Sequence, residues 1–474
     1  MVSLSSPLRS ALLVLAFAPA LAGCVPDLGP AAKPRAASDL ASVQTLPDQS
    51  GSWPGDGWWR TYGDPQLDSL VDEGLKGSPD IAQAQARIAR AEGLAEAAGA
   101  ASGPTLDANG SGGLTKQSYN NGIPPAFVPR GWKSTGTLNL RASLDLDLFG
   151  RNRANRRAAI ADRDAARIDA AQARLTLAAS IASAYADLAR LYAERDVAVA
   201  AVRIREESAK LVSQRVANGL DTEGERAQAE AGVPSTRADI IGLDTSIDLV
   251  RHQLAALVGA GPDRSLAITR PAVASFQPAA LPPAAGIDLV GRRPDIVAAR
   301  LRVEAAGQRE KAAKAAFYPD ITISGLIGLQ SLGLSKLIEQ GSTYGNVGPA
   351  LSLPIFDAGR RSGDYRESRG TYDEAVATYD RTLLTALREV ADAVSNRSGL
   401  AGQSEAARAA LVQSERAYSI ARMRYEGGLS TYLNVLTAED SVVTARRRVA
   451  DLQAQALTAD VALARALGGG FSAQ

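Results

Sequence analysis

The side chains best suited to catalysis are almost absent from this sequence. Among 474 residues there is one histidine, His252, and one cysteine, Cys24. A zinc site built from histidine and cysteine, or a cysteine nucleophile activated by histidine, needs more than this pair supplies. His252 stands between Arg251 and Gln253 in a helical run, which is typical of a solvated or packed side chain. The sequence therefore predicts no enzyme active site, no metal site and no cofactor.

Cys24 has a sequence setting that favours covalent modification instead. Arg9 precedes an apolar run over residues 11–18, and residues 21–24 (LAGC) resemble the lipobox of bacterial lipoproteins. The resemblance implies a signal peptide over residues 1–23, cleavage before Cys24, and lipid on the cysteine sulfur and the new amino group. The residue after the cysteine is Val25 rather than aspartate. For this reason the resemblance also favours sorting to the outer membrane. An ordinary signal peptide with an incidental buried cysteine is the alternative.

Charge and hydropathy narrow the class of protein further. The chain has 52 basic and 51 acidic residues, so it offers no electrostatic case for nucleic acid as a partner. After the leader, no run approaches the roughly 18 apolar residues of a membrane helix. Any crossing of a bilayer by the mature chain is therefore predicted to use a closed β-barrel.

An internal duplication organises the chain. Residues 215–220 (RVANGL) return as 424–429 (RYEGGL), and residues 257–259 (LVG) return as 466–468 (ALG), both after 209 positions. Such a return at a fixed spacing indicates repeated structural units. The chain is accordingly divided into a lipid-anchored tether and two repeats, over residues 24–62, 63–270 and 271–474. Residues 25–52 are rich in Pro, Ala and Ser, which predicts a mobile segment.

Each repeat is predicted to contain one helix followed by two strands. The helices begin at Pro79 and Pro294 and end just before a second proline, Pro104 or Pro319. The strands are expected at about residues 105–114, 137–148, 320–329 and 344–354.

Alternation along residues 137–148 predicts one leucine-rich face and one polar face, with Asp145 and Asp147 on the wall of a wet lumen. A soluble antiparallel sheet is the alternative. Because small membrane barrels need about eight strands, several copies of the chain are expected to share one barrel.

Long proline-free stretches predict a helical hairpin after each strand pair. Residues 152–214 alone would extend about 90 Å as a helix, roughly three times the hydrocarbon thickness of a bilayer. Pro234 is expected to kink the return helix of the first repeat or to remove one hydrogen bond from it. Apolar side chains form one seam in each repeat, with Ile181, Tyr185, Leu188 and Tyr192 in the first and Leu383, Leu387, Val390 and Val394 in the second. Such seams pack coiled-coil fashion against a neighbouring helix. A closed helical bundle would explain them as well as a tunnel wall does.

With these elements placed, the chain resembles the TolC-like outer membrane factors, in particular their lipoprotein branch of OprM and NodT-type efflux proteins. The matching segments occur in family order: residues 58–59 (WW), 64–67 (DPQL), 146–151 (LDLFGR), 292–296 (RRPDI), 317–319 (FYP), 353–360 (LPIFDAGR), 424–429 (RYEGGL) and 466–470 (ALGGG). The fold class that the resemblance implies is mainly α with a membrane β-barrel. Long coiled-coil helices and four strands per chain would assemble as a trimer with a twelve-stranded barrel and an α-helical periplasmic tunnel.

The resemblance also implies a function. A homotrimer would be the outer membrane exit duct of a tripartite efflux system, passively conducting small molecules such as drugs. Its partners would be a periplasmic adaptor protein, an inner-membrane pump of the RND class, and outer membrane lipid. A type I secretion outer membrane channel is one alternative. A periplasmic adaptor-like lipoprotein is another, although an adaptor would have a single hairpin within a lipoyl-like β-domain.

Two sets of site residues follow from the same resemblance. The turns at the tunnel tip would receive the adaptor, through Arg215, Gly219, Leu220, Arg424, Gly428 and Leu429. A purely structural role for the two glycines, which a helix turn with positive φ would require, is the alternative. The periplasmic gate would lie just beyond, at Leu433, Thr437 and Asp440, where many relatives carry aspartate in place of Thr437.

Overall fold

The structure, a computed structural model, describes residues 25–41, 44–46, 51–272, 282 and 285–472. They form two compact units. Unit 1 contains the described residues of 25–34, Ile88–Ala165 and Ala299–Thr378, and unit 2 contains those of Arg35–Arg87, Ala166–Ala298 and 379–472. Each unit therefore combines parts of both sequence repeats. The predicted signal peptide and Cys24 lie outside the described residues.

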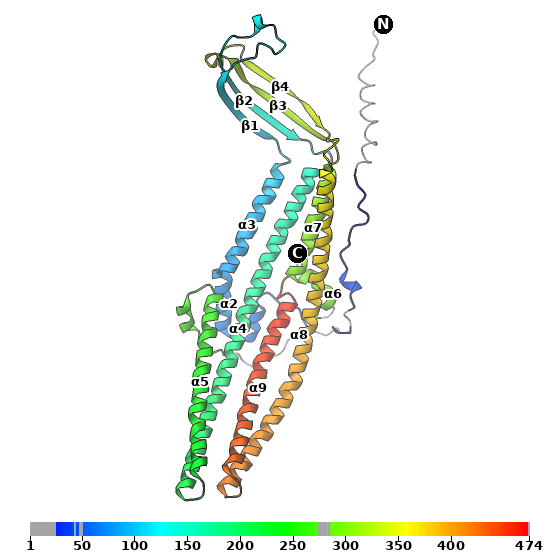
Figure 1. Cartoon of the computed structure of the whole chain (residues 1–474). Coiled ribbons are helices and arrows are strands. Elements are labelled where there is room, and N and C mark those ends of the chain that lie inside the picture. Colours follow the sequence, from blue (N-terminus) through cyan, green and yellow to red (C-terminus); the bar gives the residue numbers. More distant parts are fainter. Residues whose placement is uncertain (1–24, 42–43, 47–50, 273–281, 283–284, 473–474) are drawn as a thin grey trace. The chain divides into compact units, whose positions relative to one another are not determined.

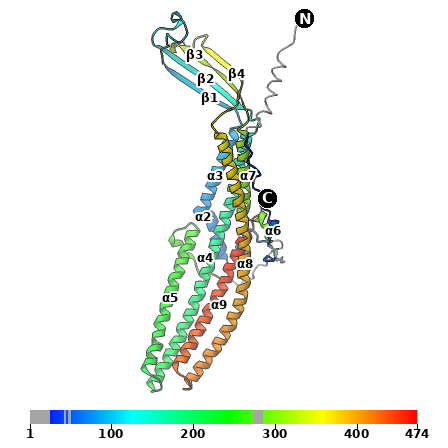
Figure 2. The same cartoon turned by 45° about the vertical axis from the view of Figure 1, so that its right-hand side comes forward.

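The helices of the two repeats match one another in length. The first repeat has α3 (Pro79–Ala100), α4 (Arg151–Ala217) and α5 (Glu223–Leu257), and the second has α7 (Pro294–Ala315), α8 (Arg360–Glu426) and α9 (Tyr432–Ala466). Equivalent helices have 22, 67 and 35 residues. Within unit 2, α5 lies beside α4 and α9 lies beside α8 in both views (Figures 1 and 2). The two hairpins thus have the equal lengths that the constant spacing of the sequence predicts.

The interior proline does not end its helix. Pro234 lies within α5, which continues to Leu257. Proline has no backbone N–H, so one hydrogen bond of the helix is lost, as the sequence predicts. No helix among the described residues combines the length and apolar character needed to cross a membrane.

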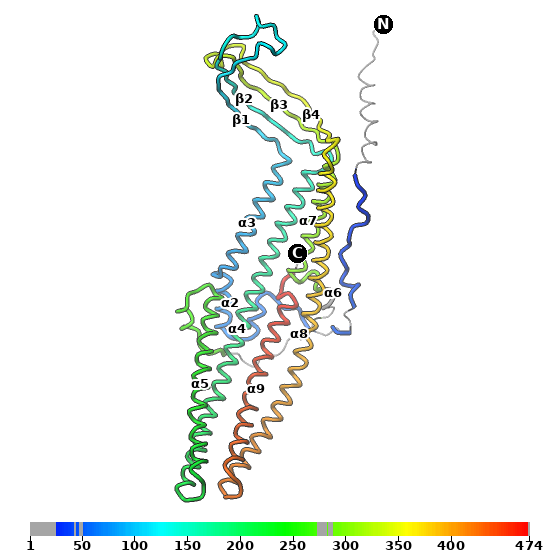
Figure 3. Tube along the Cα trace, in the orientation of Figure 1, coloured from blue at the N-terminus to red at the C-terminus, as the bar shows by residue number. Residues whose placement is uncertain are grey.

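The sheet of unit 1 has four antiparallel strands in sequence order, which run side by side in the Cα trace (Figure 3). They are β1 (Thr105–Thr115), β2 (Lys133–Asp145), β3 (Asp320–Leu332) and β4 (Thr343–Ser352). Leu140 stands opposite Ala108 and Ile327, and the next residue, Arg141, stands opposite Asp107. Because neighbouring residues point to opposite faces, the register gives one apolar and one largely polar face. The exposed apolar side chains of the first face include Leu106, Leu140, Ile327, Val347 and Leu351.

The prediction that the second strand continues to Leu148 is wrong. β2 ends at Asp145, and Asp147 has a positive φ of 46° that turns the chain toward α4. One carboxylate oxygen of Asp147 accepts the backbone N–H of Asn152, and the other accepts that of Arg153, both at 2.9 Å. These are N–H groups that the first turn of a helix leaves without partners. Asp145 and Asp147 therefore both bind groups at the strand–helix junction, and Asp147 lies outside the strand.

Other strand boundaries differ by similar amounts, and β2 begins at Lys133, four residues before its predicted start. β1 and β3 begin where the sequence predicts, at Thr105 and Asp320, but β3 continues to Leu332. β4 ends at Ser352, so Pro354 lies outside the strand. This is the expected place for proline, which has no N–H to donate to a sheet.

The N-terminal segment lies against α8, which corrects the prediction of a free tether. In unit 1, the backbone N–H of Ala32 donates to Asp373 at 3.1 Å, and Arg369 donates to the carbonyl of Gly29 at 3.2 Å. In unit 2, the backbone N–H of Arg35 donates to Asp380 at 2.9 Å. Backbone groups of the described part of this segment are therefore bound to a helix.

The main core of unit 2 surrounds the apolar seam of α4. Ile181, Tyr185 and Leu188 are fully buried, as the sequence pattern predicts. Leucines of α2 (Pro65–Gly77) and the aromatic side chains of the 3-10 helix η3 (Trp58–Tyr62) belong to the same cluster. The tryptophan pair Trp58 and Trp59 therefore packs inside the protein.

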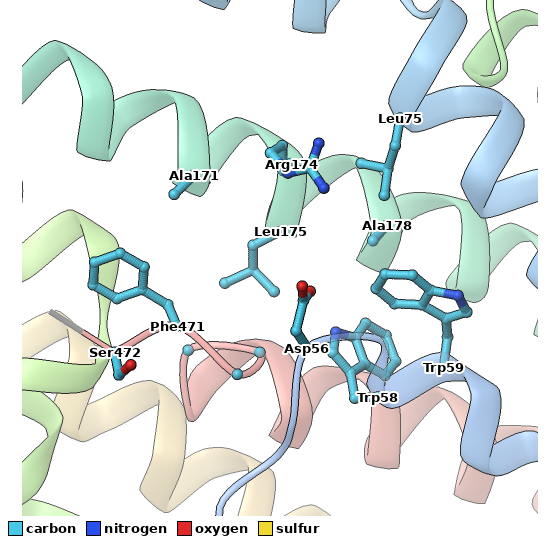
Figure 4. A pocket seen from close by; sticks show the side chains of 13 residues that line it. Asp56, Trp58, Trp59, Leu75, Ala171, Arg174, Leu175, Ala178, Phe471 and Ser472 are labelled. Atoms are coloured by element: carbon cyan, nitrogen blue, oxygen red, sulfur yellow. The ribbon is translucent and has the colours of Figure 1, made fainter. Parts of the chain in front are cut away.

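A glycine turn after α9 completes this core. Gly468, Gly469 and Gly470 all have positive φ, a conformation that costs other residues energy. A Cβ atom on Gly469 would lie 2.2 Å from Leu175 and 3.2 Å from the indole nitrogen of Trp58. Figure 4 shows these two side chains beside a cavity of about 300 Å³ that the turn also lines. The C-terminal turn thus packs directly on η3 and α4.

Candidate functional site

Two short turns connect the long helices of unit 2, and both have the same backbone structure. Leu220 N–H donates to the carbonyl of Arg215 at 2.9 Å, and Leu429 N–H donates to that of Arg424 at 2.8 Å. Gly219 and Gly428 have φ values of 70° and 72°. A Cβ atom on either would meet no atom within 4 Å. The backbone angle therefore requires glycine at both positions, and lack of space does not. This is the structural role considered for the two glycines in the sequence.

Asp221 joins the two hairpins, a role that the sequence analysis missed. Arg215 of the first hairpin donates to a carboxylate oxygen of Asp221 at 2.9 Å. The Tyr425 hydroxyl of the second hairpin donates to the same oxygen. The Arg215 guanidinium also lies 4.7 Å from the centre of the Tyr425 ring. Burial and the bond to Asp221 both raise the pKa of Tyr425, so its hydroxyl stays protonated as the donor.

The two arginines of the repeated turn have different environments. The side chain of Arg215 is 13% exposed because it is enclosed in the contacts with Asp221 and Tyr425. Arg424 is exposed and has no ion pair among the residues that the structure describes. Of the pair, only Arg424 is free to contact a partner, and Arg215 acts within the chain.

A shallow hollow of about 500 Å³ lies between the two turns. The structure brings most of the predicted tip residues together around it, with Arg424 outside the lining. Leu220 and Leu429 are 63% and 72% exposed at its border. Its lining is Arg215, Gly219, Leu220, Asp221, Thr222, Glu225, Gly428, Leu429, Ser430 and Thr431. The hollow therefore combines exposed leucines with polar side chains.

The predicted gate residues lie along one stripe at the start of α9. Leu433 is exposed, and the Thr437 hydroxyl donates to its carbonyl at 2.9 Å. Asp440 accepts from Arg205 of α4 at 2.7 Å. Asp440 thus forms an ion pair within the chain, and Leu433 remains the exposed apolar side chain of the stripe.

A carboxylate next to this stripe is buried, which the sequence does not indicate. Glu439 is 1% exposed and accepts from the Ser208 hydroxyl at 3.1 Å. Its other oxygen has no hydrogen bond, although Arg205 lies 3.4 Å away. Burial and the nearby charge of Glu439 raise the pKa values of Tyr418 in α8 and Tyr432 in α9. Burial raises the pKa of Glu439, while Arg205 opposes the rise.

Comparison with known proteins identifies the class of channel to which these turns and strands belong. A model of the family described as "Outer membrane efflux protein" matches residues 70–260 and 288–469. The chain belongs to the outer membrane efflux protein family. The two matched segments fall within the two predicted repeats.

Individual members of the outer membrane efflux family are similar over most of their length. The fusaric acid resistance protein FusA of Burkholderia cepacia is 34% identical over 74% of this chain and 67% of its own length. The multidrug resistance outer membrane protein MdtP of Escherichia coli is 28% identical over 90% of this chain and 88% of its own. The crystal structure of the outer membrane protein VceC of Vibrio cholerae is 42% identical, with a TM-score of 0.84 over 89% of this chain and all of that one.

These similarities confirm the predicted family and fold class, and they confirm the predicted function of an outer membrane exit duct for efflux. Outer membrane efflux proteins are channels, which agrees with the lack of a histidine-based site in the sequence. His252 is exposed, and no group of potential metal ligands occurs in the described part of the chain.

The buried Glu439 gives this efflux channel a predictable pH dependence. Its pKa is raised in the folded protein, so the folded state holds the proton more tightly than the unfolded chain does. The resulting stability is complete below the unfolded pKa and is lost as the pH rises through the folded pKa. Glu439→Gln should therefore unfold at a higher temperature than the unaltered protein at neutral pH, and this difference should disappear in acid. Parallel profiles in thermal unfolding across pH would contradict this assignment.

Proposed function

We propose that the chain works as a homotrimer, with three four-stranded sheets closed into one twelve-stranded barrel. Within the described residues, β1 and β4 each have a neighbouring strand on one side only. Edge strands of this kind have unpaired backbone groups that add readily to another sheet. The exposed apolar face of the sheet suits lipid, and its polar face, with Asp107, Asn139 and Arg141, suits a water-filled lumen.

The helical hairpins of this trimer are proposed to receive a periplasmic adaptor at their turns. The observation that carries the proposal is the hollow between the turns, which has exposed leucines on both sides. We assign adaptor contact to Leu220, Leu429 and Arg424, and an internal role to Arg215 and the two glycines. The adaptor would connect the duct to an inner-membrane pump of the RND class. Leu433, Thr437 and Asp440 are proposed as the periplasmic gate.

Small organic toxic compounds are the proposed cargo. Relatives named for resistance to fusaric acid and to multiple drugs support this class. Cys24 is proposed to carry a lipid, as its place in the LAGC sequence implies. We propose no enzymatic activity and no other cofactor.

Photo-cross-linking tests the docking assignment directly. A photoreactive amino acid at Leu429 should cross-link to the adaptor in living cells. The same group at Leu249, which is similarly exposed on α5, should not. The unaltered protein should be recovered from the outer membrane as a trimer. A monomeric protein, or equal cross-linking from both positions, would overturn the proposal.

A further inference from the structure

We infer that the strand–helix junctions of unit 1 bind anionic phospholipid headgroups in the membrane leaflet that faces the periplasm. The inference rests on the proposed function, because it requires the sheet of unit 1 to cross the outer membrane. It is carried by apolar and cationic side chains that occur together at the equivalent junction of both repeats.

The apolar part consists of three side chains outside the strands. Leu148 precedes α4 and is 58% exposed, while Ile355 and Phe356 precede α8 and are 89% and 87% exposed. No secondary structure contains these residues. They follow the last strand of each repeat by three or four residues, near the end of the exposed apolar face, whose last residue in β4 is Leu351. Large apolar side chains at such a border are suited to the boundary of the acyl chains.

Arginines gather at the start of both long helices. The first turns of α4 and α8 contain no acidic residue. Cations are favoured near the C-terminus of a helix and disfavoured near its N-terminus, where the peptide dipoles place positive charge. The dipole acts mainly within the first turn, so it does not favour the arginines there and it does not explain those of the second turn.

Some of these arginines are already used inside unit 1. Arg151 bonds Asp320 at 2.9 Å, Arg153 bonds Asp147 at 3.2 Å, and Arg361 bonds Asp357 at 2.7 Å. A second set has no such contact: these side chains are exposed and without an ion pair in the described parts of the chain. They are Arg156, Arg157 and Arg366.

The positions of these free arginines match the depth of a headgroup layer. Arg156 and Arg157 follow the start of α4 by five and six residues, and Arg366 follows the start of α8 by six. At about 1.5 Å per residue this is roughly 8 Å along the helix. The polar layer on each side of a bilayer is about 5 to 8 Å thick. The planar guanidinium binds phosphate through paired hydrogen bonds, so each arginine is within reach of lipid phosphates.

Titration of short-chain lipids into the purified full-length channel tests the inference. The probes are phosphatidylglycerol, phosphatidylcholine of the same chain length, and inorganic phosphate, with bound lipid measured by native mass spectrometry. One variant combines Arg156→Gln, Arg157→Gln and Arg366→Gln. Its matched control combines Arg203→Gln, Arg408→Gln and Arg416→Gln, which alter exposed arginines further along the same two helices and without an ion pair in the described residues.

The unaltered channel and the control should prefer phosphatidylglycerol. A surface arginine near anionic lipid contributes roughly a fivefold preference for that lipid. The preference of the triple variant for phosphatidylglycerol over phosphatidylcholine should therefore fall by at least about tenfold. The double variant Ile355→Ser with Phe356→Ser should weaken the binding of both lipids equally. Equal binding of the two lipids by the unaltered channel would overturn the inference, as would competition by inorganic phosphate alone or an unchanged preference in the triple variant.

Failure of the proposed function has a different signature. In that case the unaltered protein would not form a trimer or would not be found in the outer membrane. Failure of the lipid inference alone would leave a trimeric, exporting channel that does not distinguish the two lipids.

Discussion

Replacing Leu429 with glutamate should abolish export while the channel still assembles. Leu429 is 72% exposed and borders the hollow between the turns, so the folded chain does not depend on its side chain. In the complex with an adaptor, burial of a leucine contributes about 1.5 to 3 kcal/mol, and a glutamate there would also have to lose its water without a partner. Binding should weaken by roughly tenfold to hundredfold from the lost contact alone. Drug susceptibility of cells that carry the variant measures the result.

A matched substitution separates docking from general damage. Leu249→Glu changes a leucine of similar exposure, 62%, on α5. It should leave both drug tolerance and trimer formation unchanged. Leu220→Glu, on the opposite border of the hollow, should resemble Leu429→Glu. Normal tolerance in cells with Leu429→Glu would show that the turns do not dock the adaptor.

The long helices were predictable because their signals are local. In the helices that the structure describes, prolines stand at the first position, apart from Pro234, and an apolar seam marks the buried face of α4. Each signal occurs twice, once in each repeat. The equal lengths of α4 and α8 therefore follow from the fixed spacing between the two copies. Strand alternation was clear along residues 137–148, and the register of the sheet keeps one apolar face across all four strands.

The end of β2 was not predictable from the same pattern. Alternation continues through Asp147 and Leu148, yet Asp147 leaves the strand because its carboxylate binds two backbone N–H groups of α4. A short polar side chain just before a helix is a known capping signal. At Asp147 the capping signal could not be distinguished from the strand alternation, because an aspartate at this position fits both patterns.

The roles within the tip depend on contacts between distant segments. Arg215 and Arg424 occupy equivalent positions in the sequence, but only Arg215 has an aspartate, Asp221, within reach. Glu439 reads as one of many surface carboxylates of a helix until Ser208 and Arg205 of α4 are placed against it. The spacing of residues in a single sequence does not predict these side-chain partners, because they depend on how distant segments pack against one another.

Gly468→Ala should destabilise the channel strongly. Gly468 has a φ of 90°, and a Cβ atom there would lie 1.9 Å from the carbonyl oxygen of Arg292. The positive φ costs alanine about 1 to 2 kcal/mol, and forcing atoms into a packed region costs a further 1 to 3 kcal/mol or so. Arg293, the next residue, donates to the carbonyl of Ala466 at 2.9 Å, so a shift of the turn would also break this buried bond.

Other glycines of the same chain separate these causes in urea unfolding of the purified protein. Gly428→Ala has the positive φ without a neighbouring atom within 4 Å, so it should lose only about 1 to 2 kcal/mol. Gly370→Ala, in open space within α8, should gain up to about 1 kcal/mol from helix propensity. Gly259 is the equivalent of Gly468 in the first repeat, and its Cβ atom would lie 2.4 Å from the carbonyl oxygen of Gly77. Alanine at Gly259 should therefore resemble alanine at Gly468, whereas losses at both sites no larger than that at Gly428 would mean that the two contacts do not hold the helix ends together.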